Sequence, residues 1–273
     1  MTEIDTGTDV MLGRKEGRVA VLTFNRPEAR NALHSETYEA FGRVLPMLAD
    51  DDEIGAVMLT GAGGAFCAGG DVKNMSARNS GAAPAPPTFE ASIEDLRSRQ
   101  RTVSGQLHTF PKVTVAAIDG AAAGAGMSIA LACDLRVGSP RALFTTAFAK
   151  VGFSGDFGGS WFLTQLVGSA KARELYLTAD RVDAENAQRL GVLNEILDGD
   201  FESAAVDYTR RFADGPIVAQ RYIKENLNRA VIADLPTCLD AEAAAMTRCR
   251  QTDDHKEAVE AFVAKRPPVF HGR

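Results

Sequence analysis

The sequence predicts an α/β fold, with a core of alternating strands and helices (residues 1–200) followed by a helical C-terminal region (residues 201–273). Short apolar runs bounded by glycine, proline and asparagine recur through the first 140 residues, which is typical of strands. In the last hundred residues apolar side chains recur at helical spacing, as at Phe201, Ala205 and Tyr208. A chain of 273 residues is also long enough to bury a sizeable core.

Local sequence patterns predict the individual strands and helices of the core. Arg18–Phe24 is an apolar run followed by the turn segment NRPEARN, which predicts a strand. Further strands are expected at Ala56–Gly61, at Lys112–Ile118 and in DLRVGS, and helices from Ser35 towards Ala49, over Ser92–Leu107 and in MSIALAC. The proline- and alanine-rich segment Ser76–Thr88 cannot build a core and predicts a surface loop.

Capping residues predict the helices of the second half. Ser169 and Asp183 are placed to cap helices with the sequences AKARELYLTA and AENAQRL, and Gly191 ends the second of these. The tripeptide Asp214-Gly215-Pro216 begins another helix, with proline in its first turn.

Charge and composition argue against several classes of function. The net charge of −6 argues against a nucleic-acid-binding protein, which usually carries a basic surface. No apolar run approaches the length of a membrane span, and the acidic start MTEIDTGTDV does not resemble a signal peptide. The four cysteines and four histidines are scattered without metal-ligand spacing. We therefore expect a cytoplasmic protein with reduced thiols and no metal site.

Two glycine-rich segments, AFCAGGD and AAAGAG, each follow an expected strand and precede an expected helix. Small residues there let the backbone approach a ligand, and N–H groups at the start of a helix favour negative charge. Two such loops side by side would form an oxyanion hole, which stabilises an enolate or a tetrahedral oxyanion. Neither segment has the full pattern of a nucleoside-triphosphate or dinucleotide loop.

These loops belong to a longer series of motifs: NRPEARNAL, GAFCAGGDVKNM, DGAAAGAGMSIALACDLRV, KVGFSGDFGGSWFLTQLVG, AKARELYLTADRVDAENAQRLGVLNEI and AFVAKRPP. In this order, from about Val19 to Pro267, they resemble the crotonase, or enoyl-CoA hydratase/isomerase, superfamily. The resemblance implies a ClpP-like spiral of ββα units and an acyl-CoA substrate, with coenzyme A as part of the substrate and no other cofactor. It also implies C-terminal helices that assemble a homotrimer, or a hexamer as a dimer of trimers.

The resemblance also implies roles for individual residues by their motif positions. It places the oxyanion-hole amides at Gly70 and Ala125 and a catalytic carboxylate at Asp156. Contacts to the substrate are expected from Ala68, Asp71, Val72, Lys73, Met75, Ser128, Phe148 and Trp161. Contacts to the CoA phosphates and pantetheine are expected from Arg26, Arg30, Phe262 and Lys265.

The chain departs from the hydratase pattern at two positions. Hydratases of this superfamily carry a glutamate where this chain has Ser128, three residues after the second oxyanion residue, and another where it has Phe148. Adding water to a double bond needs one group to activate the water and one to protonate the α-carbon. Serine and phenylalanine cannot supply that pair near neutral pH, so hydration is not the expected reaction.

Asp156 has two interpretations. Aspartate is a preferred N-cap and Gly158–Val167 has a helical pattern, so its carboxylate could simply bind backbone amides. The resemblance instead places it where 1,2-epoxyphenylacetyl-CoA isomerases, dienoyl-CoA isomerases and chlorobenzoyl-CoA dehalogenases carry a catalytic aspartate, and the first of these is the most similar. Partial burial among Phe153, Phe157 and Trp161 would raise the pKa of this carboxyl, as a proton shuttle requires.

The expected activity is therefore that of an enoyl-CoA isomerase with Asp156 as the base. The alternatives are a hydratase-like lyase of fatty-acid or aromatic-acid degradation, thioester hydrolysis, a C–C bond reaction, and a non-catalytic acyl-CoA-binding subunit. Three other groups have simpler interpretations. Cys67 is expected to be a small buried hydrophobe, His108 a packing residue, and Ser128 a serine bonded to its own backbone.

Overall fold

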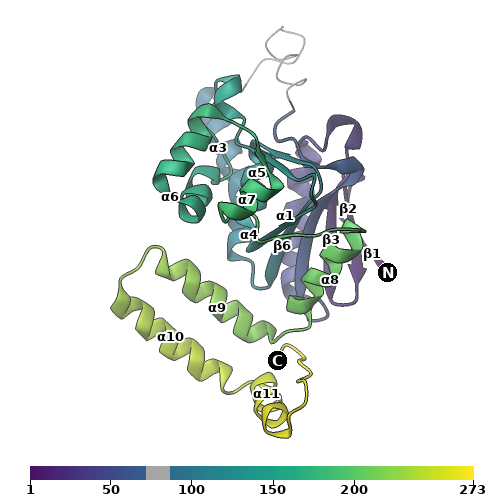
Figure 1. Ribbon diagram of the computed structural model, residues 1–273, viewed down its shortest axis with the longest axis vertical. Coiled ribbons are helices and arrows are strands. Elements are labelled where there is room, and N and C mark those ends of the chain that lie inside the picture. The colour runs from purple at the N-terminus through teal and green to yellow at the C-terminus, as the bar shows by residue number, and fades with distance from the viewer. Residues whose placement is uncertain (72–86) are drawn as a thin grey trace.

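The computed structural model describes residues 1–71 and 87–273, which form two β-sheets covered by helices (Figure 1). The larger sheet has the order β1 (Thr2–Ile4), β2 (Met11–Glu16), β3 (Val19–Phe24), β4 (Ala56–Gly61), β6 (Val113–Ile118), β8 (Leu135–Gly138) and β11 (Glu195–Ile196). The smaller sheet has the order β10 (Val182–Asp183), β9 (Leu143–Thr145), β7 (Ala121–Ala123) and β5 (Ala65–Cys67).

From β4 to β9 successive strands alternate between the two sheets, so this part of the chain follows a spiral. The strands β4, β6 and β8 are parallel neighbours in the larger sheet, and β5, β7 and β9 are parallel neighbours in the smaller one. In the described part of the chain, the helices that come next after β5, β7 and β9 include α3 (Phe89–Gln100), α5 (Ala125–Ala132) and α6 (Gly159–Thr178). This repeat confirms the α/β spiral of ββα units.

The larger sheet is buried on both faces, which explains why its central strands are apolar throughout. On one face Leu22 and Leu59 join the main core under helices α1 (Ser35–Asp50) and α5. On the other face Val21 and Met58 pack beneath α8 (Phe201–Ala213). The remaining helical segments are η1 (Pro27–Ala29), η2 (Ala62–Gly64), η3 (Arg101–Gly105), α4 (Gln106–Thr109), η4 (Phe148–Val151) and α7 (Ala184–Arg189).

The last three helices, α9 (Ile217–Ala230), α10 (Leu235–Cys249) and α11 (Asp253–Ala264), extend away from the two sheets (Figure 1). They expose many large apolar side chains, including Leu227, Leu239 and Val263. The helix α8 precedes them but packs on β3, β4 and β6 as part of the core. Within the described residues, no helix combines the length and apolar character that crossing a membrane requires.

Local caps correct several expected helix boundaries. His34, not Ser35, is the N-cap residue of α1, and its amide donates to the Thr37 hydroxyl at 3.3 Å. The helix expected from Ser92 begins earlier, where the Thr88 hydroxyl accepts from the Ala91 amide at 3.2 Å. Ser169 does not cap a helix. It follows a kink inside α6 at Gly168, whose φ of +77° is not helical, and its hydroxyl accepts from Arg173 instead.

Two other caps lie close to their expected places. Asp183 caps α7 as predicted, with its Oδ1 accepting from the Asn186 amide at 2.9 Å. Pro216 is the N-cap residue of α9, so the proline stands just before the first turn instead of within it.

Candidate active site

Parallel pairing of β5 with β7 brings the two glycine-rich loops together. Cys67 lies opposite Ala122, so both loops leave the smaller sheet at the same edge. The first loop packs directly against the second at Gly69, where a Cβ atom would stand 2.6 Å from the Ala123 carbonyl oxygen and 3.1 Å from the Ala125 nitrogen. The φ of +83° at Gly69 also favours glycine. The predicted association of the two loops is therefore present.

Neighbouring amides in these loops have acceptors, but those of Gly70 and Ala125 do not within residues 1–71 and 87–273. The Ala68 amide donates to the Arg30 carbonyl at 3.0 Å, and the Gly69 amide lies 3.4 Å from the Cys67 sulfur. Ala125 is the first residue of α5, where amides lack an acceptor within the helix. Two backbone donors in contacting loops can stabilise a negatively charged oxygen.

Asp156 lies half-buried in the loop before α6, and its side chain does not cap that helix. The N-cap residue is Gly158, and only the main-chain carbonyl of Asp156 accepts from the helix, from Gly159 at 3.1 Å. Its Oδ1 atom is buried and has no hydrogen-bond partner within the described residues. Burial raises the pKa of Asp156 from 3.8 to about 6. The interpretation of Asp156 as a helix cap is therefore wrong.

Of the three aromatic residues expected around Asp156, only Phe157 is buried as predicted. Its backbone has a φ of +51°, its amide donates to Gln100 Oε1 at 2.8 Å, and its ring stacks on Tyr38 with 5.9 Å between centroids. Phe153 is 54% exposed, and Trp161 packs against His108 and Phe162. The left-handed backbone at Phe157 is uncommon for a residue other than glycine.

Two partly buried tyrosines, Tyr38 and Tyr176, lie close enough to Asp156 to be influenced by its charge. Burial raises the pKa of Tyr38 and Tyr176 to about 12, and the negative charge of Asp156 contributes to both shifts. Sequence reasoning does not single out either residue, because each stands in a helical pattern where an aromatic side chain is ordinary packing. Tyr38 comes from α1 and Tyr176 from α6.

Ser128 and Phe148, at the two hydratase glutamate positions, both lie next to Tyr176. The Phe148 ring stacks on the Tyr176 ring at 6.1 Å with an interplanar angle of 8°. The Ser128 hydroxyl donates to the Gly124 carbonyl at 3.3 Å, which confirms that it bonds to its own backbone. Ser128 Oγ and the Tyr176 hydroxyl oxygen both lie beside Gly159, where a Cβ atom would stand 2.2 Å and 2.5 Å from them. A Cβ on Gly124 would lie 3.8 Å from the Phe148 ring. These contacts connect the second glycine-rich loop to the loop that carries Asp156.

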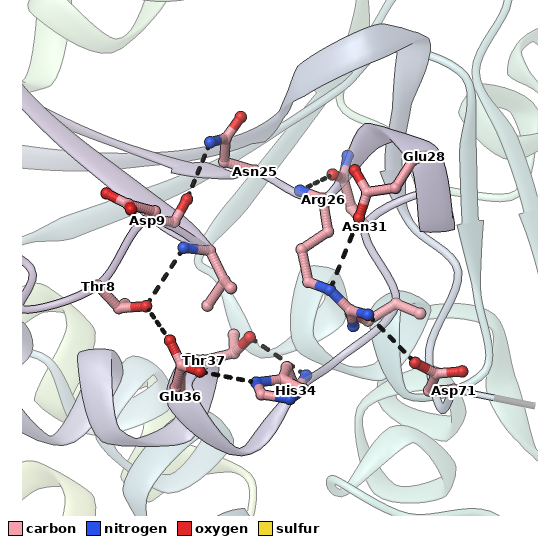
Figure 2. A network of polar contacts seen from close by, with 12 residues as sticks. Thr8, Asp9, Asn25, Arg26, Glu28, Asn31, His34, Glu36, Thr37 and Asp71 are labelled. Atoms are coloured by element: carbon pink, nitrogen blue, oxygen red, sulfur yellow. Dashed lines mark hydrogen bonds and ion pairs between the residues drawn. The ribbon is translucent and has the colours of Figure 1, made fainter. Parts of the chain in front are cut away.

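Arg26, one of the expected CoA contacts, binds groups of its own chain (Figure 2). Its guanidinium donates to the Ala32 carbonyl at 2.8 Å and pairs with Asp71 Oδ2 at 3.3 Å. Asp71 directly follows Gly70, so its pair with Arg26 supports the end of the first glycine-rich loop. Arg30 is exposed and faces no such acid in the described ion pairs.

The other expected substrate contacts are spread over the molecule. Phe262 is 86% exposed, and both it and Lys265 belong to the end of α11, far from α5 (Figure 1). Val72, Lys73 and Met75 lie outside the described residues.

Trp161 lines a hollow of about 390 Å³ whose walls include Gln100, Ser104, His108, Phe157 and Phe162. This hollow adjoins the Asp156 loop at Phe157, and its lining combines aromatic rings with polar side chains, among them Arg97 and Arg101. A larger hollow of about 1140 Å³ follows β1 and β2 and includes none of the expected site residues.

Cys67 and His108 have the simple roles expected from the sequence. Cys67 is fully buried, and burial raises the pKa of its thiol to about 12, so the thiol is protonated at neutral pH. His108 packs edge-on against Trp161 and Phe162, and burial lowers its pKa. Among the described residues, no group of three histidine, cysteine or acidic side chains is placed to hold a metal ion.

Comparison with known proteins gives the family. The sequence profile of the family described as enoyl-CoA hydratase/isomerase matches residues 14–273. A short-chain-enoyl-CoA hydratase of Clostridium acetobutylicum is 35% identical over 92% of this chain and 94% of its own length. A 1,2-epoxyphenylacetyl-CoA isomerase of Escherichia coli is 33% identical over 97% of this chain and 99% of its own.

A solved structure agrees with these relatives. The enoyl-CoA hydratase from Polaromonas sp. JS666 superposes with a TM-score of 0.88 at 33% identity, covering 95% of this chain and 99% of its own. Relatives named as hydratase and as isomerase match to nearly the same extent. Overall similarity therefore does not distinguish the two reactions. The chain belongs to the enoyl-CoA hydratase/isomerase, or crotonase, family, whose members act on acyl-CoA substrates.

Proposed function

We propose that this protein is an enoyl-CoA isomerase that moves the double bond of a 3-enoyl-CoA to the 2-position. One observation carries the proposal: Asp156 is a half-buried carboxyl with an unpartnered Oδ1, while Ser128 and Phe148 stand where a hydratase would carry its two glutamates. The site therefore has one proton carrier in place of two. One carrier suits the movement of a proton between two carbons of the same substrate.

In the proposed reaction the ionised Asp156 carboxylate takes a proton from the α-carbon of the substrate. The electrons of that C–H bond form a dienolate, whose negative charge lies on the thioester oxygen between the Gly70 and Ala125 amides. Asp156, now protonated, returns the proton to the γ-carbon, and the double bond becomes conjugated with the thioester. Atoms and charge balance without an added water molecule or cofactor. The aromatic rings of Phe157, Trp161 and Phe162 in the hollow beside this loop would suit an unsaturated or planar acyl group.

The direct test gives the purified protein a 3-enoyl-CoA and, separately, a 2-enoyl-CoA. We expect the ultraviolet absorbance of a conjugated thioester to appear from the first, and no addition of water to the second by mass spectrometry. In D₂O, deuterium should enter the product only as far as the Asp156 proton exchanges with solvent. Hydration of the 2-enoyl-CoA without double-bond migration would instead make the protein a hydratase, like the relative named above.

The pH dependence of isomerisation should report the buried carboxyl. Burial raises the pKa of Asp156 to about 6, and only its ionised form can accept a proton. We therefore expect kcat/KM to fall about tenfold for each pH unit below about 6 and to level off above it. The measurement is kcat/KM from pH 4.5 to 8. A profile that stays flat down to about pH 4.5 would point to a base with an ordinary carboxyl pKa.

We also propose that the exposed faces of α9–α11 assemble the chain into a trimer, or a hexamer of two trimers. Ile223 and Leu227 stand one turn apart on α9 and are 56% and 64% exposed, and Phe262 on α11 is 86% exposed. Because α11 lies far from α5 in its own chain, we propose that Phe262 and Lys265 approach the CoA of a neighbouring copy. Apolar exposure on this scale is typical of an interface.

Placing two acids on this face should dissociate the assembly. The double variant Ile223→Asp/Leu227→Asp is expected to shift the mass measured by light scattering from three or six chains to one. The matched control is Leu12→Asp, on β2, which replaces a residue of similar exposure outside α9–α11 and should leave the mass unchanged. A wild-type protein that is already monomeric would contradict the proposed assembly.

A further inference from the structure

We propose that His108 and Trp161 are specificity-determining residues that limit the length of the acyl group, so that the substrate carries a short acyl chain instead of a long one. The inference rests on the proposed acyl-CoA reaction and deepens it by naming the class of substrate. Its central observation is that these two side chains line two separate hollows.

The first of these is the hollow beside Phe157, which adjoins the proposed base (the Phe157 hollow). Phe157 directly follows Asp156, and its amide donates to Gln100 Oε1 at 2.8 Å, which ties the loop to α3. Both Phe157 and Gln100 line the hollow. Its volume of about 390 Å³ is near the lower end for ligand pockets, which span ~300–1,000 Å³. The Phe157 hollow therefore has room for a short acyl chain beside Asp156.

A second hollow of about 570 Å³ lies between α4 and α9 (the α9 hollow). Helix α9 is fixed beside α4 by Asn228, whose Nδ2 donates to the His108 carbonyl at 3.1 Å. The charged Lys224 in its wall is paired with Asp134 at 2.6 Å, and Phe110 adds apolar surface. A hydrocarbon chain can therefore enter the α9 hollow while the charge of Lys224 stays paired.

Among the described residues, His108 and Trp161 are the two that line both hollows. His108 comes from α4 and Trp161 from the first turn of α6, and their rings pack edge to face with 5.2 Å between centroids. The Phe162 ring packs on both, at 5.4 Å and 5.1 Å, so the three rings hold one another in place. Burial lowers the pKa of His108, so its ring is uncharged at neutral pH and suits contact with hydrocarbon. The pair therefore forms the wall between the two hollows.

The test measures how the dissociation constants of saturated acyl-CoAs depend on chain length, from butyryl- to dodecanoyl-CoA, by titration calorimetry. Each methylene that becomes buried tightens binding by up to about fourfold. In wild type we expect the affinity to rise until the Phe157 hollow is filled and then to stop rising. In Trp161→Ala the wall is open, so the rise should continue for longer chains that enter the α9 hollow. His108→Ala opens the wall from α4 and should shift the profile in the same direction, which keeps the test decisive if Trp161→Ala does not fold.

Two further variants provide the opposite change and the matched control. Gly105 lines the Phe157 hollow, and a Cβ there would meet nothing closer than 3.7 Å, so leucine fits. Gly105→Leu should narrow the hollow and make the affinity stop rising at a shorter chain. Phe153→Ala removes an exposed ring from the Asp156 loop that lines neither hollow, and it should leave the profile unchanged.

The outcomes separate this inference from the isomerase proposal, because the readout is binding. Wild-type affinity that keeps rising to dodecanoyl-CoA, or equal profiles in wild type, Trp161→Ala and His108→Ala, would overturn the inference. An unchanged profile in Gly105→Leu would show that the acyl chain does not enter the Phe157 hollow, and would also overturn it. The expected profiles without any double-bond migration would support the inference and overturn the isomerase proposal alone.

Discussion

Replacing Asp156 by asparagine is expected to lower kcat for 3-enoyl-CoA isomerisation by about 10²–10⁴-fold, the range typical of a lost general acid–base group. Asparagine keeps the size of the side chain but cannot accept the α-proton. The Gly70 and Ala125 amides stay in place, so the affinity for acyl-CoA should change little. Initial rates with a 3-enoyl-CoA and the dissociation constant of butyryl-CoA together measure the two effects.

The same substitution should not weaken the fold. The pKa of Asp156 in the folded protein, about 6, lies above the value of 3.8 in the unfolded chain, so protonation favours the folded state. That contribution is complete below pH 3.8 and is lost as the pH rises through 6. At pH 7 the wild type has lost it, whereas asparagine needs no proton. We therefore expect Asp156→Asn to melt at the same temperature as wild type or higher.

A matched control removes a carboxylate of similar size elsewhere. Asp119→Asn breaks a pair with Arg141 near the surface and should keep its activity. Full activity in Asp156→Asn would show that another group carries the proton. A lower melting temperature with unchanged activity would instead return Asp156 to a structural role.

The sequence predicts the strands and glycine-rich loops of this site well, because these parts of the site are formed by the backbone. Apolar runs with clear ends indicate strands such as Ala56–Gly61, and the glycines of AFCAGGD and AAAGAG mark loops that must approach each other. Parallel pairing of β5 and β7 then brings the loops together whatever their exact side chains. The family resemblance adds the expectation that the Gly70 and Ala125 amides face the substrate.

The side chains around Asp156 could not be predicted in the same way. Tyr38 and Tyr176 reach it from helices far apart in the chain, and nothing in their local pattern distinguishes them from packing residues. Phe153 and Phe157 stand in the same short loop, yet Phe157 is buried and Phe153 is 54% exposed. Ring and hydroxyl contacts depend on tertiary placement, which composition and spacing do not determine.

The second large effect is expected at Gly69, where the two oxyanion loops touch. In Gly69→Ala the new methyl group would lie 2.6 Å from the Ala123 carbonyl oxygen and 3.1 Å from the Ala125 nitrogen, so the loops must separate. A shift of about 1 Å at a reacting group can cost ~10²-fold in rate. We therefore expect kcat for isomerisation to fall by about 10²-fold or more, because the Gly70 and Ala125 amides would no longer reach the same oxygen.

Backbone strain alone must be separated from this clash, and the same chain offers the control. Gly64 has a φ of +78°, close to the +83° of Gly69, but a Cβ there would meet nothing within 4 Å. Both substitutions force alanine into the left-handed region, at a cost of roughly 1–2 kcal/mol. Gly64→Ala should therefore lower the melting temperature and keep its kcat, whereas Gly69→Ala should lose both. Equal kcat in the two variants would mean that the contact between the loops does not set the donor geometry, and that each amide is held by its own strand and helix.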